Sequence, residues 1–226
     1  MRTDIKRYTL TYILIAASSI VYLLSAFLSR DIVDMDVEVL VDMGALFGPF
    51  TVLKGEWWRL LSAMFLHGGM THLLMNMFSL YIVGRGAETY FDTRSYLSIY
   101  FFSGIIGGLV SLYMHPVSVG VGASGAIFGV FGALAGFFLA HRDKIASHSK
   151  AFMKDFSVII LINLVIGLTI PSIDVSAHIG GLVVGLIGGY MISKDPKWVL
   201  AFNTSMILIS IAIGSYLSDL YAQIQF

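Results

Sequence analysis

Long apolar segments recur along this chain and constrain its fold more than any other feature. Each is 15 to 21 residues long, and a helix of about 20 apolar residues crosses the roughly 30 Å hydrocarbon core of a bilayer. Seven helical spans are predicted, at residues 8–28, 69–83, 96–113, 123–140, 156–170, 175–192 and 198–217. The sequence therefore predicts an all-α polytopic membrane protein.

The composition excludes several other classes of protein. Apolar residues make up 57% of the chain and charged residues 12%, whereas a soluble domain is about 45 to 50% apolar and about 25% charged. The 14 Lys and Arg residues balance the 14 Asp and Glu residues, so we expect no nucleic-acid partner. The chain has no cysteine, which excludes disulfides, thiolate metal sites and cysteine nucleophiles.

The distribution of Lys and Arg predicts how the spans are oriented. Short cytoplasmic loops are enriched in these residues, and 11 of the 14 lie on inner segments if the N-terminus is inside. We therefore expect a cytoplasmic N-terminus and a C-terminus outside. The first span lacks the cleavage site of a signal peptide and is predicted to be a retained anchor. The second and fifth spans are short and would need tilt or local thinning to cross.

The connection between the first two spans, at about residues 29–68, is much longer than the others. It carries Trp57, Trp58 and Phe65 among other aromatic residues, and such side chains settle at the membrane–water interface. An acidic run from Asp31 to Asp42 reads as a solvated face of the same loop. The sequence predicts an interfacial loop here rather than a flexible linker.

Four polar residues lie within predicted spans, where such groups are costly and mark functional candidates. They are His72 and Asn76 in the second span, Ser124 in the fourth and His178 in the sixth. Each of these spans enters the membrane from the outer face in the predicted orientation, and each residue lies near the start of its span. Topology alone therefore places all four at one depth.

These residue types suit acyl transfer. Ser124 lies in Gly-Ala-Ser-Gly at the start of a span, where unpaired backbone N–H groups can stabilise an oxyanion. His178 is the candidate base that activates the serine. The two helices can approach closely because Gly181 is followed by further glycines at four-residue spacing. His72 and Asn76 share one helix face and could add donors. The prediction is peptide hydrolysis within the membrane.

These polar residues also have other interpretations. A serine or histidine taken singly is more often a packing residue, and an asparagine can join two helices. His67, His72 and His178 could form a metal site, but the chain has no H-E-x-x-H motif or intramembrane carboxylate to complete one, so we expect no metal and no cofactor. A channel would need polar residues through the inner halves of the even-numbered spans, which lack them.

Several motifs together resemble the rhomboid family of intramembrane serine proteases. They are Trp58-Arg59, the stretch from His72 to Asn76, the stretch from Gly122 to Ala126, and the stretch from Ala177 to Gly181. The resemblance implies a six-helix catalytic core at residues 1–192, including the interfacial loop at about 29–68. It also implies an additional C-terminal transmembrane helix and short tail at residues 193–226.

The resemblance also implies roles for individual residues. Ser124 would be the nucleophile and His178 its base in a dyad, while His72, Asn76 and the backbone N–H of Ser124 would form the oxyanion hole. Trp58-Arg59 and Glu88 would be structural. Phe128 stands where some members place a tyrosine that stacks on the catalytic histidine, so we expect activity to survive without that hydroxyl.

Two further expectations concern Asp174 and the partners. Asp174 lies four residues before His178 and could either orient the imidazole or cap the helix, and the cap is favoured. The family implies substrates that are single-pass transmembrane proteins, met within the lipid bilayer; a relative that binds such helices without cleaving them is the competing possibility. A bacterial plasma membrane is the expected location, and the sequence predicts neither substrate nor oligomeric state.

Overall fold

A computed structural model describes residues 6–143 and 173–223 of the chain. The predicted span at residues 156–170 lies outside the described residues. The elements are α2 (Thr9–Ser29), α3 (Val37–Asp42), the π-helical turn η1 (Pro49–Leu53), α4 (Arg59–Ser62), α5 (Met70–Tyr90), α6 (Thr93–Met114), α7 (Ser124–Ala140), α9 (Val175–Lys194) and α10 (Trp198–Tyr221).

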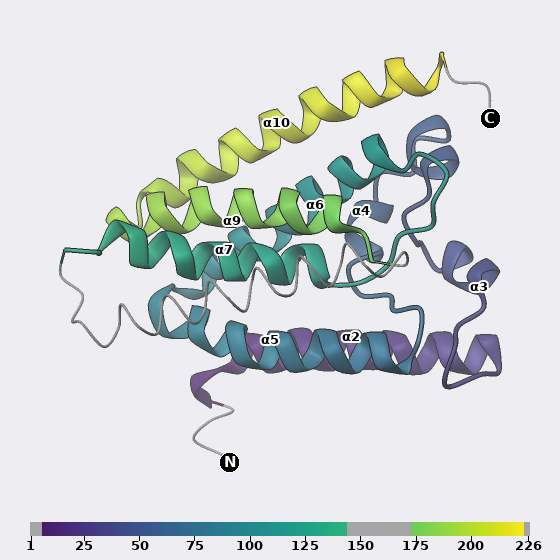
Figure 1. Cartoon of the computed structure of the whole chain (residues 1–226), viewed down its shortest axis with the longest axis horizontal. Coiled ribbons are helices and arrows are strands. Elements are labelled where there is room, and N and C mark those ends of the chain that lie inside the picture. Colours follow the sequence, from purple (N-terminus) through teal and green to yellow (C-terminus); the bar gives the residue numbers. More distant parts are fainter. Residues whose placement is uncertain (1–5, 144–172, 224–226) are drawn as a thin grey trace.

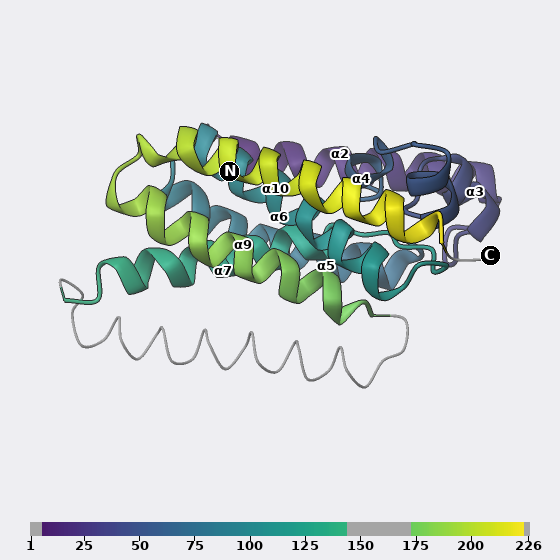
Figure 2. The same ribbon diagram turned by 90° about the horizontal axis from the view of Figure 1, so that it is seen from above.

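The prediction of a multi-pass helical membrane protein is confirmed. Four of the described helices, α2, α6, α9 and α10, are long and apolar enough to cross a bilayer. The helix α7 is equally apolar in character but has 17 residues. In Figures 1 and 2 these long helices, with α5, run along one common direction and form a bundle.

The helix of the second predicted span extends beyond its short apolar stretch, because α5 continues to Tyr90. Its last two turns carry Arg85 and Glu88, which interrupt the apolar pattern. Arg85 lies over the rings of Tyr8, which precedes α2, and of Tyr81 on α5 itself. The Glu88 carboxylate accepts hydrogen bonds from the backbone N–H groups of Leu10 and Thr11, at 3.1 and 2.7 Å. These groups start α2 and would otherwise be unpaired, so Glu88 caps α2 and has the structural role that the resemblance implied.

The helices α7 and α9 pack backbone against backbone. A Cβ atom on Gly185 would overlap with the carbonyl oxygen of Gly129, so no larger residue fits there. The contact repeats along the pair, with Gly181 on Gly125, Gly185 on Gly129 and Gly189 on Ala133. Small residues at four-residue spacing allow this close approach, as the sequence predicted. The helix α6 packs against both α7 and α9.

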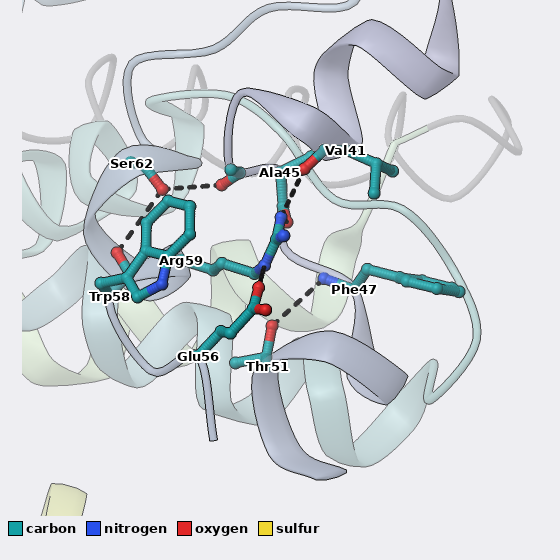
Figure 3. Close-up of polar contacts among 9 residues, drawn as sticks. Val41, Ala45, Phe47, Thr51, Glu56, Trp58, Arg59 and Ser62 are labelled. Carbon is teal, nitrogen blue, oxygen red and sulfur yellow. Dashed lines mark hydrogen bonds and ion pairs between the residues drawn. The ribbon is translucent and has the colours of Figure 1, made fainter. Parts of the chain in front are cut away.

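Residues 30–69 form an ordered structure at one end of the bundle, called the loop end here. Arg59 is only 4% exposed, and Figure 3 shows its guanidinium among Val41, Ala45 and Glu56. Its Nη1 donates to the carbonyl oxygens of Val41 and Ala45, at 2.5 and 3.0 Å, and its Nε donates to the Glu56 carboxylate at 2.6 Å. A buried guanidinium with three acceptors holds this loop together.

The loop end is also tied to the segment that precedes α7. Leu46 and Gly120 exchange two backbone hydrogen bonds, of 2.9 and 2.8 Å, and the Gly122 N–H donates to the Ala63 carbonyl at 2.9 Å. These long-range bonds satisfy backbone groups that no helix pairs. They fix the path of the chain into Ser124.

Candidate active site

Ser124 is the first residue of α7, at the loop end of the bundle. The chain reaches it through Gly122, whose φ of +124° lies in the region that side chains rarely adopt. The hydrogen bond from Gly122 to Ala63 holds this turn in place. The first N–H groups of α7 lack intrahelical acceptors, so the turn presents a hydroxyl beside backbone donors.

His178 lies on α9, one turn from the start of that helix, and is buried. Its Nε2 is 2.7 Å from the Ser124 Oγ, a distance at which the serine O–H donates to a neutral imidazole. The glycine contacts between α7 and α9 bring the two side chains within reach of each other. The structure therefore joins the two residues that the sequence proposed as nucleophile and base.

Phe128 determines how the imidazole lies. It is one turn after Ser124 on α7, and its ring stacks on His178 with a centroid distance of 4.3 Å and an interplanar angle of 10°. Stacking of this kind favours one plane for the imidazole. The aromatic face is present without the tyrosine hydroxyl of some relatives, so the contact depends on the ring alone.

His72 lies beside the serine turn. A Cβ atom added to Gly122 would be 2.8 Å from the His72 Nε2 and 3.9 Å from the Ser124 Oγ, so both atoms border the same small space. Asn76 is one turn further along α5, and its Nδ2 donates to the His72 carbonyl at 2.9 Å. An amide nitrogen carries two N–H donors, and this bond within the helix uses one of them.

Asp174 caps α9 rather than orienting the base. Its carboxylate accepts from the Ala177 N–H at 3.1 Å and from the Ser176 hydroxyl at 2.5 Å. The His178 Nδ1 is buried and has no hydrogen-bond partner among the described residues. Burial alone would raise the pKa of the Asp174 carboxyl, but hydrogen bonds from Ser111, Ser176 and Ala177 outweigh it, so the pKa is lowered. The favoured alternative, a helix cap, is confirmed.

Sequence reasoning missed the place of His67. It lies in the segment that joins α4 to α5, and its ring is fully buried and packs edge-to-face against His72, with centroids 5.1 Å apart. Nothing in an apolar pattern distinguishes this histidine from one at a membrane interface. In residues 6–143 and 173–223, no group of three or more His, Cys, Asp or Glu side chains is arranged to hold a metal ion.

The structure pairs a serine with a histidine across two closely packed helices of a membrane protein, an arrangement in which an imidazole can activate a hydroxyl. Comparison with protein families identifies the fold: the model of the rhomboid domain matches residues 54–195. The chain belongs to the rhomboid family.

Individual relatives agree with this assignment. Rhomboid protease GluP of Bacillus subtilis (strain 168) is 34% identical over 208 residues, which cover 91% of this chain and 39% of that protein. RHOMBOID-like protein 6, mitochondrial, of Arabidopsis thaliana is 40% identical over 155 residues, which cover 69% of this chain and 50% of that protein. RHOMBOID-like protein 2 of the same plant is 38% identical over 156 residues, covering 69% and 49%. The matched region spans half of these relatives or less.

Proposed function

We propose that the chain is an intramembrane serine endopeptidase, which hydrolyses peptide bonds in or near transmembrane segments of membrane proteins. The observation that carries the proposal is the 2.7 Å contact between the Ser124 Oγ and the His178 Nε2 in a multi-pass helical protein. Membership of the rhomboid family and the similarity to a protein named as a rhomboid protease support it.

The first half of the proposed reaction acylates the serine. The His178 Nε2 takes the hydroxyl proton while the Ser124 Oγ forms a bond to the scissile carbonyl carbon. The resulting oxyanion is stabilised by the backbone N–H of Ser124 and by donors from His72 and Asn76. His178 then gives its proton to the departing amine nitrogen as the peptide bond breaks, which leaves an acyl-enzyme on Ser124.

The second half releases the acyl group. A water molecule gives a proton to His178 and attacks the acyl carbon, and the same donors stabilise the second oxyanion. Collapse of this intermediate returns the proton from His178 to the Ser124 Oγ and frees a carboxylic acid. Phe128 supports both halves because its ring keeps the imidazole in one plane. No cofactor takes part in the proposed steps.

The proposed substrates are single-pass transmembrane proteins. A peptide bond inside a helix is shielded by its own hydrogen bonds, so the substrate must unwind locally before its carbonyl reaches Ser124. Residues that weaken helices near the cleavage site would favour this unwinding. Because the catalytic residues lie near the starts of α5, α7 and α9, we propose that cleavage occurs toward the loop end of the bundle.

The proposed division of the chain follows from the rhomboid resemblance, and its proposed orientation follows from the charge pattern. A core at residues 1–192, with the interfacial loop at 29–68, would contain the catalytic residues, and residues 193–226 would add one helix and a tail. The placing of 11 of the 14 Lys and Arg residues on one side favours a cytoplasmic N-terminus and a loop end that faces outside. The proposed location is a bacterial plasma membrane.

The decisive experiment is labelling of the detergent-solubilised protein with a fluorophosphonate probe. Wild type should be labelled, whereas Ser124→Ala and His178→Ala should not. Ser218→Ala and His141→Ala are matched controls, because each residue bonds only to a carbonyl of its own helix among the contacts described. Folded wild type that neither reacts with the probe nor cleaves a transmembrane substrate would contradict the proposal and favour a helix-binding role.

A further inference from the structure

The C-terminal end of α10 is packed against the rest of the protein at the loop end, where the Tyr221 side chain is buried. Most of α10 is exposed, and its buried residues are Phe202, Met206, Leu217 and Tyr221. Tyr221 is 1% exposed although it lies in the last turn of the helix. Figure 1 shows this end of α10 at the same end of the molecule as α3 and the C-terminal part of α6. A buried tyrosine needs a partner for its hydroxyl.

The partner is a backbone carbonyl that α6 itself cannot satisfy. The Tyr221 hydroxyl donates to the Leu112 carbonyl oxygen at 2.7 Å. The residue four positions after Leu112 is Pro116, which has no N–H to offer. The Pro116 carbonyl oxygen is also 3.4 Å from the same hydroxyl. Tyr221 therefore supplies the donor that the sequence of α6 lacks at this turn.

The loop end closes around the same point. A Cβ atom on Gly48, which precedes η1, would overlap with the Pro116 carbonyl oxygen and would lie 2.6 Å from the Tyr221 ring and hydroxyl. Three segments that are far apart in the sequence therefore meet without space for another side chain. Contacts of α10 with both α6 and η1 are consistent with this junction.

The junction lies at the start of the segment that leads to the nucleophile. Residues 115–123 leave α6 at Pro116 and pair with Leu46 through Gly120. They then bond to Ala63 through Gly122, two residues before Ser124. The segment is thus anchored by Tyr221 at its beginning and by backbone bonds at its end.

We propose that Tyr221 is a positioning residue for the reaction. By holding the Leu112 and Pro116 carbonyls, its hydroxyl fixes residues 115–123 and, through them, the turn that presents the Ser124 backbone N–H to the oxyanion. This assigns a role in catalysis to α10, which contributes no group to the dyad or the oxyanion hole. The inference rests on the proposed protease function.

The test compares two tyrosines of α10 in the full chain. Tyr221→Phe removes the hydroxyl and keeps the ring, while Tyr216→Phe is the matched control, because Tyr216 is 55% exposed and meets Tyr113 through its ring. With a transmembrane substrate in the same detergent, Tyr221→Phe should lower kcat about three- to tenfold and leave KM unchanged. Tyr216→Phe should match wild type.

A second measurement does not depend on catalysis. Hydrogen–deuterium exchange of the backbone amides in residues 115–123 should be faster in Tyr221→Phe than in wild type and in Tyr216→Phe. Unchanged exchange in this segment would overturn the link between Tyr221 and the turn. Faster exchange with an unchanged kcat would overturn its role in catalysis.

The failure of this inference can be told apart from the failure of the proposed function. A wild-type protein that cleaves substrate, beside a Tyr221→Phe variant with the same kcat, would refute the inference alone. A decrease in kcat that follows only a loss of folded protein, seen as an equal decrease in fluorophosphonate-labelled sites, would also refute it. Absence of labelling in wild type concerns the dyad instead, and the exchange experiment still tests the structural link.

Discussion

Two helices follow α7 in the described part of the chain, and they are attached in opposite ways. Along its length, glycines of α9 contact the backbone of α7, and there is no space for a side chain between the two helices. The helix α10 meets α6, α9 and η1 through a few large side chains, and most of its surface is exposed. The first interface contains the Ser124 and His178 pair, and the second contains no catalytic group.

The difference shows which two helices must keep a fixed position relative to each other. A contact of 2.7 Å between two side chains on separate helices survives only if the helices cannot shift relative to each other. Backbone contact provides this because it has no rotamers to rearrange. Side-chain contact tolerates repacking, so α10 can be attached more loosely than α9.

The largest expected effect comes from inserting a side chain between α7 and α9. Gly185→Leu would place carbon atoms on the Gly129 carbonyl and should lower the free energy of unfolding by about 3 kcal/mol or more. Fluorophosphonate labelling of Ser124 should disappear with it.

The matched control for that change is Gly214→Ala on α10. A Cβ atom there would lie 3.8 Å from the Trp57 ring, an ordinary contact. The variant should be as stable as wild type or slightly more stable. Thermal unfolding of both variants in the same detergent measures this difference. An equal decrease in the free energy of unfolding for both would contradict the difference between the two interfaces.

Phe202→Ala should weaken the attachment of α10 by about 3 kcal/mol. The Phe202 ring is buried, lies against Gly188 of α9 and packs edge-to-face on Phe102, with centroids 6.1 Å apart. Below the unfolding temperature, labelling of Ser124 should nonetheless match wild type, because the dyad interface is separate. Leu200→Ala, at a side chain that is 73% exposed, is the control. Loss of labelling in the folded variant would show that the interfaces are coupled.

Phe128→Ala changes the interface between α7 and α9 by removing a ring instead of adding a side chain. Loss of the stacked ring should cost about 1 kcal/mol in the transition state, which corresponds to about fivefold in kcat. Phe128→Tyr keeps the ring and should retain the wild-type kcat. The measurement is steady-state cleavage of a transmembrane substrate, and an unchanged kcat in Phe128→Ala would show that backbone packing alone orients His178.

Glu88→Gln tests the opposite end of the bundle. It keeps the shape of the side chain but removes the charge that caps α2 at Leu10 and Thr11. We expect a loss of about 1 kcal/mol in the free energy of unfolding, with no change in the labelling rate of the folded protein. Glu38→Gln, at an exposed position in the first turn of α3, serves as the comparison.

The smallest expected effect is that of Asp174→Asn. Because the pKa of Asp174 is lowered in the folded protein, its carboxylate stabilises the fold above its unfolded pKa of about 4. That contribution is lost as the pH falls through the lower folded pKa. The variant should lose about 0.5 kcal/mol at pH 7 and show less dependence on acid pH. A large decrease in kcat would instead make Asp174 a partner of His178.

The sequence predicted most of the fold and the pairing of Ser124 with His178 for identifiable reasons. Apolar length identifies helices, and spacing from a span's start gives depth, so Ser124 and His178 could be placed together before any coordinates. The predicted apolar span ends before α5 does, because hydropathy gives no sign that the Glu88 carboxylate caps α2. The position of Tyr221 depends on a long-range bond from its hydroxyl to the Leu112 carbonyl, which leaves no periodic signal.

The repeat of glycines between α7 and α9 also limits sliding. The two helices run parallel, and the contacts recur every four residues, so α9 could slip along α7 only in steps of about 6 Å. Intermediate positions would force a Cβ into a carbonyl group. Any such step would carry His178 a full turn away from Ser124. The interface therefore allows only discrete registers. Ser124 and His178 are either in contact or separated by a full turn, with no partly aligned arrangement between.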